Sequence, residues 1–272
     1  MFSERILTRL TQVPGVRTLW SRFPLGPVDL RVRFGVFPRP QYAYGVYHAA
    51  DLARRLGLPS ISVIELGVAG GAGLLALEQI AETVADDLEV AIHVAGFDSG
   101  KGMPDPVDYR DLPHVWGAGF YAMDEEKLRS RLSPTTELVL GDVGDVVSRW
   151  AAPAPIGFVA FDLDYYSSTQ AALSLFEPAE TRPHLPRVYC YFDDIIWPER
   201  ACHNEYVGEL RAIREFNEAH AALKVCPIHM LRHTLPHRSA WSDAMYVLHD
   251  FQHPLYCRNI TTRDEASTQL SI

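Results

Sequence analysis

The 272-residue sequence predicts an α/β fold, in which a mostly parallel seven-stranded sheet carries helices on both faces. Short apolar runs rich in β-branched and aromatic residues alternate with segments whose apolar residues recur at helical spacing. Two of the apolar runs, at 158–161 and 188–192, are each followed by two aspartates. Polar residues at strand ends are typical of the crevice where open α/β sheets bind ligands.

The alternation of strands and helices defines the expected elements. Residues 60–66 form the first apolar run, and the helix expected at 72–84 follows because five apolar residues there fall on one face. The segment 99–123 contains several Gly and Pro residues, and loops of this length in compact domains are usually functional. The other expected elements are helices at about 44–56, 124–132 and 203–222, and strands at 88–97, 137–140, 158–161, 188–192, 224–231 and 244–249.

Residues 1–45 are predicted to form an N-terminal arm or cap, residues 46–257 a single domain, and residues 258–272 a flexible tail. The first 33 residues carry six arginines against two acids, and their apolar residues predict a short amphipathic helix that stops near Pro14-Gly15. Such an arm packs on its own domain, covers a neighbouring subunit in a homodimer or larger homo-oligomer, closes over a substrate, or lies on an anionic membrane.

The bulk composition excludes several classes of protein. A net charge of −9 argues against nucleic-acid binding, which usually requires a basic surface. No apolar stretch has the length of a membrane span or the pattern of a signal peptide. The four cysteines are scattered and form no zinc-binding or CxxC spacing, so a cytoplasmic location is expected.

Four acidic residues are expected to converge at the strand ends. Asp162 and Asp164 follow one apolar run, and Asp193 and Asp194 follow another. Carboxylates at short distance repel one another, and a hard cation such as Mg²⁺ or Ca²⁺ relieves that repulsion. The alternative is that Asp193 and Asp194 cap the next helix while Asp162 lies in a turn.

A glycine-rich turn follows the first expected strand and precedes a helix, which is a nucleotide-cofactor arrangement. The dinucleotide fingerprint is absent, because Ala69 occupies its middle glycine position. Asp98, at the end of the second strand, can hold ribose hydroxyls, and Asp142, after the third, can accept from an adenine amino group. Both residues are equally suited to ordinary turns.

Four segments in this order resemble the class I S-adenosylmethionine-dependent methyltransferases, and more narrowly the macrocin O-methyltransferase family of metal-dependent sugar O-methyltransferases. They are Glu65-Leu-Gly-Val-Ala-Gly-Gly71, Gly96-Phe-Asp-Ser-Gly-Lys-Gly-Met-Pro104, Asp162-Leu-Asp-Tyr-Tyr-Ser-Ser-Thr169 and Asp193-Asp194. The third segment is the most specific. The chain departs from the family pattern at Gly100, Lys101, Tyr165 and Ile195, and the segment 181–187 resembles an insertion.

The resemblance implies a Rossmann-like class I methyltransferase fold and O-methylation of a small hydroxylated molecule or sugar. It implies that Asp162, Asp193 and Asp194 bind Mg²⁺ or another divalent cation, and that Asp162 also serves as the general base. The residues implied to form the S-adenosylmethionine site are Glu65, Gly67, Val68, Ala69, Gly71, Asp98, Ser99 and Asp142.

Two other functions remain open on the sequence. A metal-dependent phosphate-ester hydrolase needs cations near the strand ends, for which Lys101 and Arg187 are candidates. A catalytically inactive relative would keep the cofactor site and lose the substrate pocket. His114 is a second candidate base, and the late histidines lack zinc spacing. The aromatic residues that are candidates for the substrate wall are Trp116, Phe120, Tyr121, Tyr165 and Tyr166.

Overall fold

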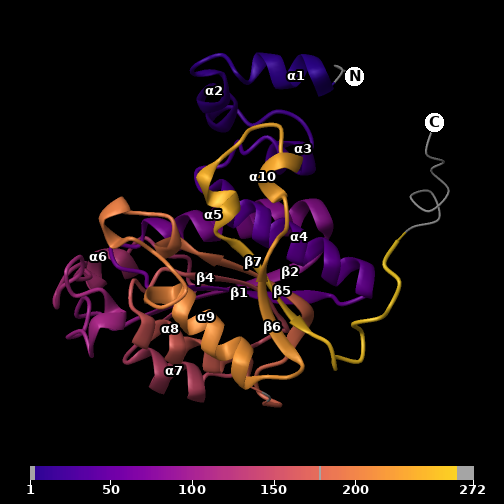
Figure 1. Ribbon diagram of the computed structural model, residues 1–272. Coiled ribbons are helices and arrows are strands. Elements are labelled where there is room, and N and C mark those ends of the chain that lie inside the picture. The colour runs from indigo at the N-terminus through magenta and orange to yellow at the C-terminus, as the bar shows by residue number, and fades with distance from the viewer. Residues whose placement is uncertain (1–3, 178, 262–272) are drawn as a thin grey trace.

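The computed structural model describes residues 4–177 and 179–261, and its centre is one seven-stranded sheet (Figure 1). The strand order is β3-β2-β1-β4-β5-β7-β6. The first five strands are parallel, and β7 runs antiparallel to both of its neighbours, so the predicted mostly parallel sheet is confirmed. The strands are β1 (Ser60–Leu66), β2 (Ala91–Asp98), β3 (Glu137–Leu140), β4 (Ile156–Phe161), β5 (His184–Phe192), β6 (Leu223–Pro227) and β7 (Met245–Asp250).

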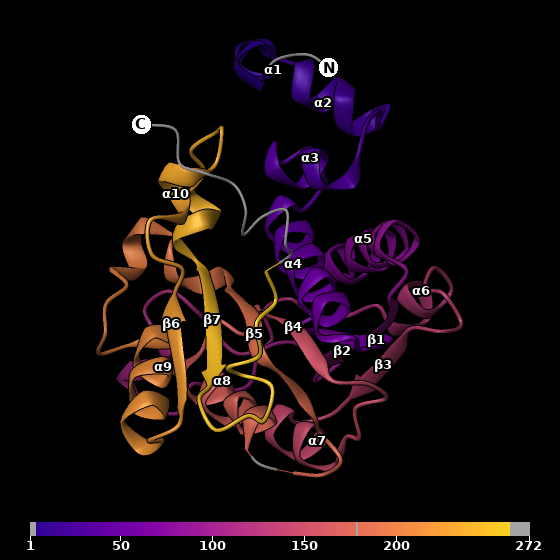
Figure 2. The same ribbon diagram turned by 90° about the vertical axis from the view of Figure 1, so that its right-hand side faces the viewer.

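Helices cover both faces of this sheet, as Figures 1 and 2 show. Helices α4 and α5 lie on one face, and α7, α8 and α9 lie on the other. The helices are α1 (Glu4–Leu10), α2 (Val16–Arg22), α3 (Val28–Arg33), α4 (Pro40–Leu56), α5 (Ala72–Leu88), α6 (Glu125–Arg129), α7 (Val143–Arg149), α8 (Tyr166–Ala172), α9 (Gly208–Ala219) and α10 (Leu231–Thr234). None of them combines the length and apolarity needed to cross a membrane.

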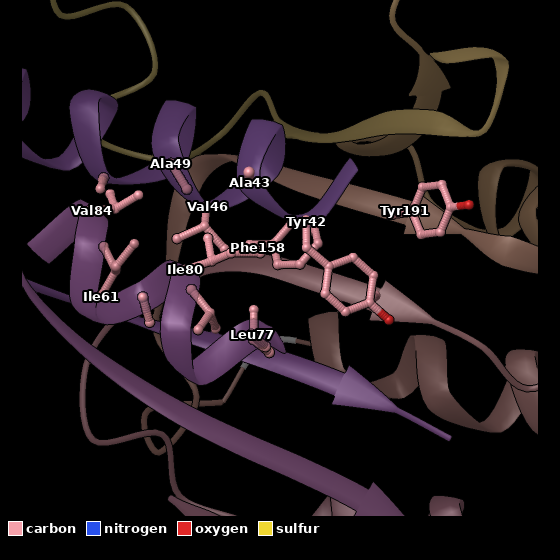
Figure 3. Close-up of a cluster of buried hydrophobic side chains, with 14 of the residues drawn as sticks. Tyr42, Ala43, Val46, Ala49, Ile61, Leu77, Ile80, Val84, Phe158 and Tyr191 are labelled. Carbon is pink, nitrogen blue, oxygen red and sulfur yellow. The ribbon is translucent and has the colours of Figure 1, made fainter. Parts of the chain in front are cut away.

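The face covered by α4 and α5 contains the larger apolar core, part of which is drawn in Figure 3. Tyr42 and Val46 of α4 lie beside Phe158 of β4, and all three are completely buried. Gly45 allows this close approach, because a Cβ there would lie 2.2 Å from the Phe158 ring. The packing fixes α4 directly over the central strands, whose carboxyl ends carry the acidic residues.

Several predicted boundaries are wrong. The strand expected from residue 88 begins at Ala91, because Leu88 continues the buried face of α5. The strand expected at 224–231 ends at Pro227, because proline cannot extend the hydrogen-bond ladder, and α10 begins at Leu231. The helix expected at 203–222 is limited to α9, since Asn204 accepts the amide of Tyr206 in a turn.

Two features were not anticipated. Helices α7 and α8 are only seven residues long each, too short for a recognisable apolar period. The presumed insertion at 181–187 lies partly in β5, which begins at His184. The tail expected at 258–272 falls mostly outside the described residues.

The N-terminal arm forms α1, α2 and α3, and Figures 1 and 2 place α1 and α2 beyond the layers of the domain. Exposed apolar side chains occur along it, including Leu19 and Phe23, each 60% exposed. The arm contacts its own domain where Thr11 Oγ1 lies 2.7 Å from His237 Nε2. Helix α4 begins at Pro40, so the expected arm of residues 1–45 includes the first turn of this helix.

Candidate active site

A cavity of about 410 Å³ opens at the carboxyl ends of the five parallel strands. Each strand contributes one residue at or just beyond its end: Gly67, Asp98, Asp142, Asp162 and Asp193. Residues from the glycine turn and residues from the acidic strand ends therefore line one cavity. The same cavity is also lined by Ala69, Ser99, Asp164 and Asp194.

Asp162, Asp193 and Asp194 come together as a cluster, with one carboxylate oxygen from each within 4.8 Å of the others. Tyr191 Oη donates to Asp193 Oδ1 at 2.7 Å and fixes its orientation. Burial, and then the charges of Asp193 and Glu65, raise the pKa of Asp162 well above its ordinary value. Three carboxylates in one partly buried cluster match the oxygen ligands that Mg²⁺ and Ca²⁺ prefer, so the cluster fits a divalent cation.

Two further buried acids, Glu209 and Asp164, contact Asp194 of this cluster. Glu209, at the start of α9, is completely buried and accepts the amide of Asp194 at 3.2 Å. The amide of Asp164 donates to Asp194 Oδ2 at 2.9 Å, and Asp164 adopts a left-handed conformation with φ of 57°. Burial raises the pKa of Asp164 to about 6 and that of Glu209 well above its usual value. The region therefore concentrates carboxyl groups whose ionised forms a bound cation would stabilise.

The glycine turn packs directly against the strand that carries Asp162. Gly67 has a φ of 87°, and a Cβ there would lie 1.8 Å from the backbone oxygen of Asp162. Gly71 also has a positive φ, and its Cβ would collide with Leu128 at 2.2 Å. These two glycines are required by backbone conformation and close approach, which L-residues with side chains cannot satisfy.

Asp98 organises this turn. Its Oδ2 accepts the amides of Val68 and Ala69 at 2.9 and 2.8 Å, and its Oδ1 accepts the amide of Gly100 at 2.6 Å. Asp142 has a capping role, because its Oδ1 accepts the amides of the first residues of α7. Both carboxylates line the cavity as well, so turn formation and ligand contact are compatible at each position.

Glu65 lies beneath the cavity and does not line it. Its Oε1 accepts a hydrogen bond from Tyr42 Oη at 2.6 Å, while its Oε2 has no hydrogen-bond partner. Gly73 leaves the space that this carboxyl occupies, since a Cβ there would lie 1.8 Å from Oε1. Complete burial raises the pKa of Glu65 to about 7. Among the predicted cofactor residues, Val68 and Gly71 also stand outside the cavity lining.

Glu65→Gln is expected to stabilise the ligand-free protein more at pH 8 than at pH 5. A carboxyl whose pKa is raised in the folded state keeps its stabilising effect below the unfolded pKa and loses it as the pH rises towards the folded pKa. The glutamine cannot ionise, so its advantage in the free energy of unfolding should grow by about 2 kcal/mol between these pH values. Urea unfolding of both proteins measures this difference. The buried His48, whose pKa is lowered to about 4, is common to both and cancels. A difference that is constant with pH would contradict the argument.

The candidate aromatic and basic residues divide into two groups. Trp116 and Tyr121 line the cavity. Tyr165 is buried in a small core and donates to Pro104 O, while Tyr166 Oη donates to Glu215 at 2.5 Å, so neither is in the lining. Phe120 and His114 are also absent from the lining.

The cations that a phosphate-ester hydrolase would need are absent from the lining. Lys101 is exposed outside the cavity, and Arg187 stacks on Tyr256 and donates to its backbone oxygen. No lysine, arginine or histidine is among the described residues that line the cavity. Within the described parts of the chain, no histidine belongs to a metal-ligating cluster.

The architecture has counterparts among solved structures. The O-methyltransferase NovP matches 70% of this chain and 76% of its own, with 16% identity and a TM-score of 0.50. The chain has the fold of an O-methyltransferase. The predicted Rossmann-like class I methyltransferase fold is thereby confirmed, and at this identity the likeness establishes the fold alone.

Two further similarities have lower TM-scores. The calicheamicin methyltransferase CalS11 covers 92% of this chain and 94% of its own, with 21% identity and a TM-score of 0.47. The O-methyltransferase TomG from Streptomyces achromogenes covers 75% and 77%, with 15% identity and a TM-score of 0.39. No protein-family model matches the sequence, and no curated protein matches it.

Several residues of the site escaped the sequence analysis. Glu209 was missed because an acid in the first turn of an amphipathic helix is usually a solvated helix-end charge. Tyr42 was missed because its contact with Glu65 joins a helix to a strand. Trp197 also lines the cavity. It follows Asp194 closely in the sequence, and this position near a strand end could have indicated that it belongs to the site.

Proposed function

We propose that this protein is an S-adenosylmethionine-dependent O-methyltransferase that acts on a hydroxyl group of a small molecule or sugar, assisted by a divalent cation. One observation carries the proposal: Gly67, Asp98 and Asp142 line the same cavity as Asp162 and Asp193. Methyl transfer requires the methyl donor and the acceptor hydroxyl to be adjacent and aligned, and alignment alone contributes on the order of 7–11 kcal/mol.

The glycine turn and Asp98 are the proposed cofactor site. Gly67 keeps this turn free of side-chain atoms on the side that faces Asp162, and Asp98 holds its amides in place. The carboxylates of Asp98 and Asp142 retain lone pairs for hydroxyl and amino groups. S-adenosylmethionine supplies the methyl group, on a sulfonium sulfur that is already a good leaving group.

Asp162, Asp193 and Asp194 are the proposed cation ligands. When bound there, a divalent cation would supply Lewis acidity towards the hydroxyl of the acceptor. A carboxylate oxygen of Asp162 is the proposed acceptor of the hydroxyl proton, because Asp162 lines the cavity directly after the end of β4. Trp116 and Trp197 also line the cavity.

Asp98→Ala is expected to weaken the binding of S-adenosylhomocysteine by on the order of 10- to 100-fold, because the glycine turn loses the acceptor of two of its amides and the loop after β2 loses the acceptor of a third. Isothermal titration calorimetry measures this affinity directly. Asp105→Ala is the matched control, since Asp105 lies exposed in the following loop and does not line the cavity. Equal affinity of the two variants would remove Asp98 from the cofactor site. Absence of binding by the wild-type protein would contradict the proposed function itself.

A further inference from the structure

The cavity combines a high density of acids with an absence of basic side chains. Six aspartates line it, and no lysine, arginine or histidine does so among the described residues. Arg39 and Arg200 are cations whose charges act on groups of the site. Neither lines the cavity. An anionic group on the acceptor would therefore face carboxylates and would find no basic side chain among the described residues of the cavity lining to pair with.

Loading the site does not reverse this charge. A divalent cation adds two positive charges, and S-adenosylmethionine adds one, because its sulfonium and ammonium outweigh its carboxylate. The sum for six ionised aspartates is −3 (−6 + 3), and it remains −1 if two of them hold a proton. Like charges within a few ångströms repel strongly in a partly desolvated site. The cavity loaded with the cation and S-adenosylmethionine therefore disfavours an acceptor that carries a negative charge.

Aromatic surface forms another part of the lining. Trp197 is 68% exposed and Tyr121 is 54% exposed, and both line the cavity. Trp116 is buried beside Tyr121, with ring centroids 6.4 Å apart, and its indole N–H has no hydrogen-bond partner. Exposed aromatic faces bind the flat apolar faces of rings, and they attract cations.

We propose that the acceptor is an uncharged or cationic hydroxylated ring that stacks on Trp197, and that the site rejects rings carrying phosphate or carboxylate groups. This inference rests on the proposed function and assigns its substrate class. The hydroxyl groups of the ring face the cluster of Asp162, Asp193 and Asp194. Trp197 is the specificity-determining residue for the ring of the acceptor. The aspartates that line the cavity select the charge of the acceptor.

Three catechols that differ mainly in the charge of one substituent test the proposal. They are 3,4-dihydroxybenzylamine, 3,4-dihydroxybenzyl alcohol and 3,4-dihydroxybenzoate. Calorimetric titration uses the full chain loaded with S-adenosylhomocysteine and Mg²⁺. We expect the amine and the alcohol to bind and the benzoate to bind at least about tenfold more weakly, the effect of one like charge at close range. Benzoate affinity equal to that of the amine overturns the proposal.

Matched variants separate stacking from charge. Trp197→Ala should weaken the amine and the alcohol by up to about tenfold, while Trp197→Phe should retain most of the affinity. Phe251→Ala is the control, because Phe251 is similarly exposed, at 51%, outside the cavity. Asp164→Asn suits the left-handed conformation and should reduce the preference for the amine over the benzoate at least about threefold. Unchanged affinity in Trp197→Ala would overturn the stacking role.

Binding of S-adenosylhomocysteine distinguishes failure of the proposed function from failure of the assigned substrate class. If S-adenosylhomocysteine does not bind, the proposed function is wrong and the inference falls with it. If S-adenosylhomocysteine and Mg²⁺ bind but the three catechols bind equally well, the function stands and the assigned substrate class is wrong.

Discussion

Asp193→Asn is expected to reduce turnover by on the order of 10³-fold and to weaken Mg²⁺ binding at least about tenfold, while the fold is retained. The variant removes one charged oxygen from the cluster of Asp162, Asp193 and Asp194. Its remaining carbonyl oxygen can still accept the hydrogen bond of Tyr191, so the local structure has little reason to change.

The same substitution should make the cation-free protein more stable, by about 1 kcal/mol, because it removes a like charge from a cluster whose members repel. Urea unfolding with and without Mg²⁺ measures both effects. Wild-type protein should gain stability from Mg²⁺, and Asp193→Asn should gain little. Asp86→Asn changes the same charge at an exposed position near the end of α5 and serves as the control. If Mg²⁺ stabilises Asp193→Asn as much as the wild type, Asp193 is not a ligand.

Gly67→Ala is expected to lower the free energy of unfolding by about 3 kcal/mol or more. An alanine at this position must adopt a positive φ, and its Cβ would lie 1.8 Å from the backbone oxygen of Asp162. The contact is a backbone atom, which cannot rotate away as a flexible side chain can. The glycine turn must therefore move away from the end of β4. Affinity for S-adenosylhomocysteine should fall by on the order of 100-fold, because the turn is displaced from the cofactor.

Gly70→Ala is the matched control in the same turn. Nothing lies within 4 Å of a Cβ at this position, and no positive φ is required there. Its stability should remain within about 0.5 kcal/mol of the wild type. If Gly67→Ala and Gly70→Ala unfold at the same urea concentration, close approach of the turn to Asp162 does not constrain the fold.

The strand ends of the site were predictable because each acid follows a buried apolar run, and parallel strands bring their carboxyl ends to one edge. Asp98, Asp162 and Asp193 satisfy this rule, and all three line the cavity. The rule needs only the order of strands and helices, which the apolar periodicity supplies. The rule therefore predicts the site correctly even though the predicted boundaries of β2, β6 and α9 are wrong by several residues.

The residues that support these acids were not predictable from the sequence. Glu209 reaches Asp194 only because α9 packs over the end of β5, and Tyr42 reaches Glu65 only because α4 packs over β1. These contacts depend on tertiary packing between elements, for which local periodicity carries no signal. The division of the aromatic residues between core and cavity has the same cause, since Tyr165 and Tyr166 directly follow the lining residue Asp164 and yet are buried elsewhere.

The adjacency of cofactor and cation can be measured by nuclear relaxation. Mn²⁺ replaces Mg²⁺, since carboxylate and water ligands suit both ions, and S-adenosylmethionine carries ¹³C in its sulfonium methyl group. If one cavity holds both, bound Mn²⁺ will strongly enhance relaxation of the methyl carbon in the wild-type protein, and the enhancement will disappear in Asp193→Asn. Saturating binding of both ligands without any enhancement would contradict the account, because the ion and the methyl group would then lie in separate places.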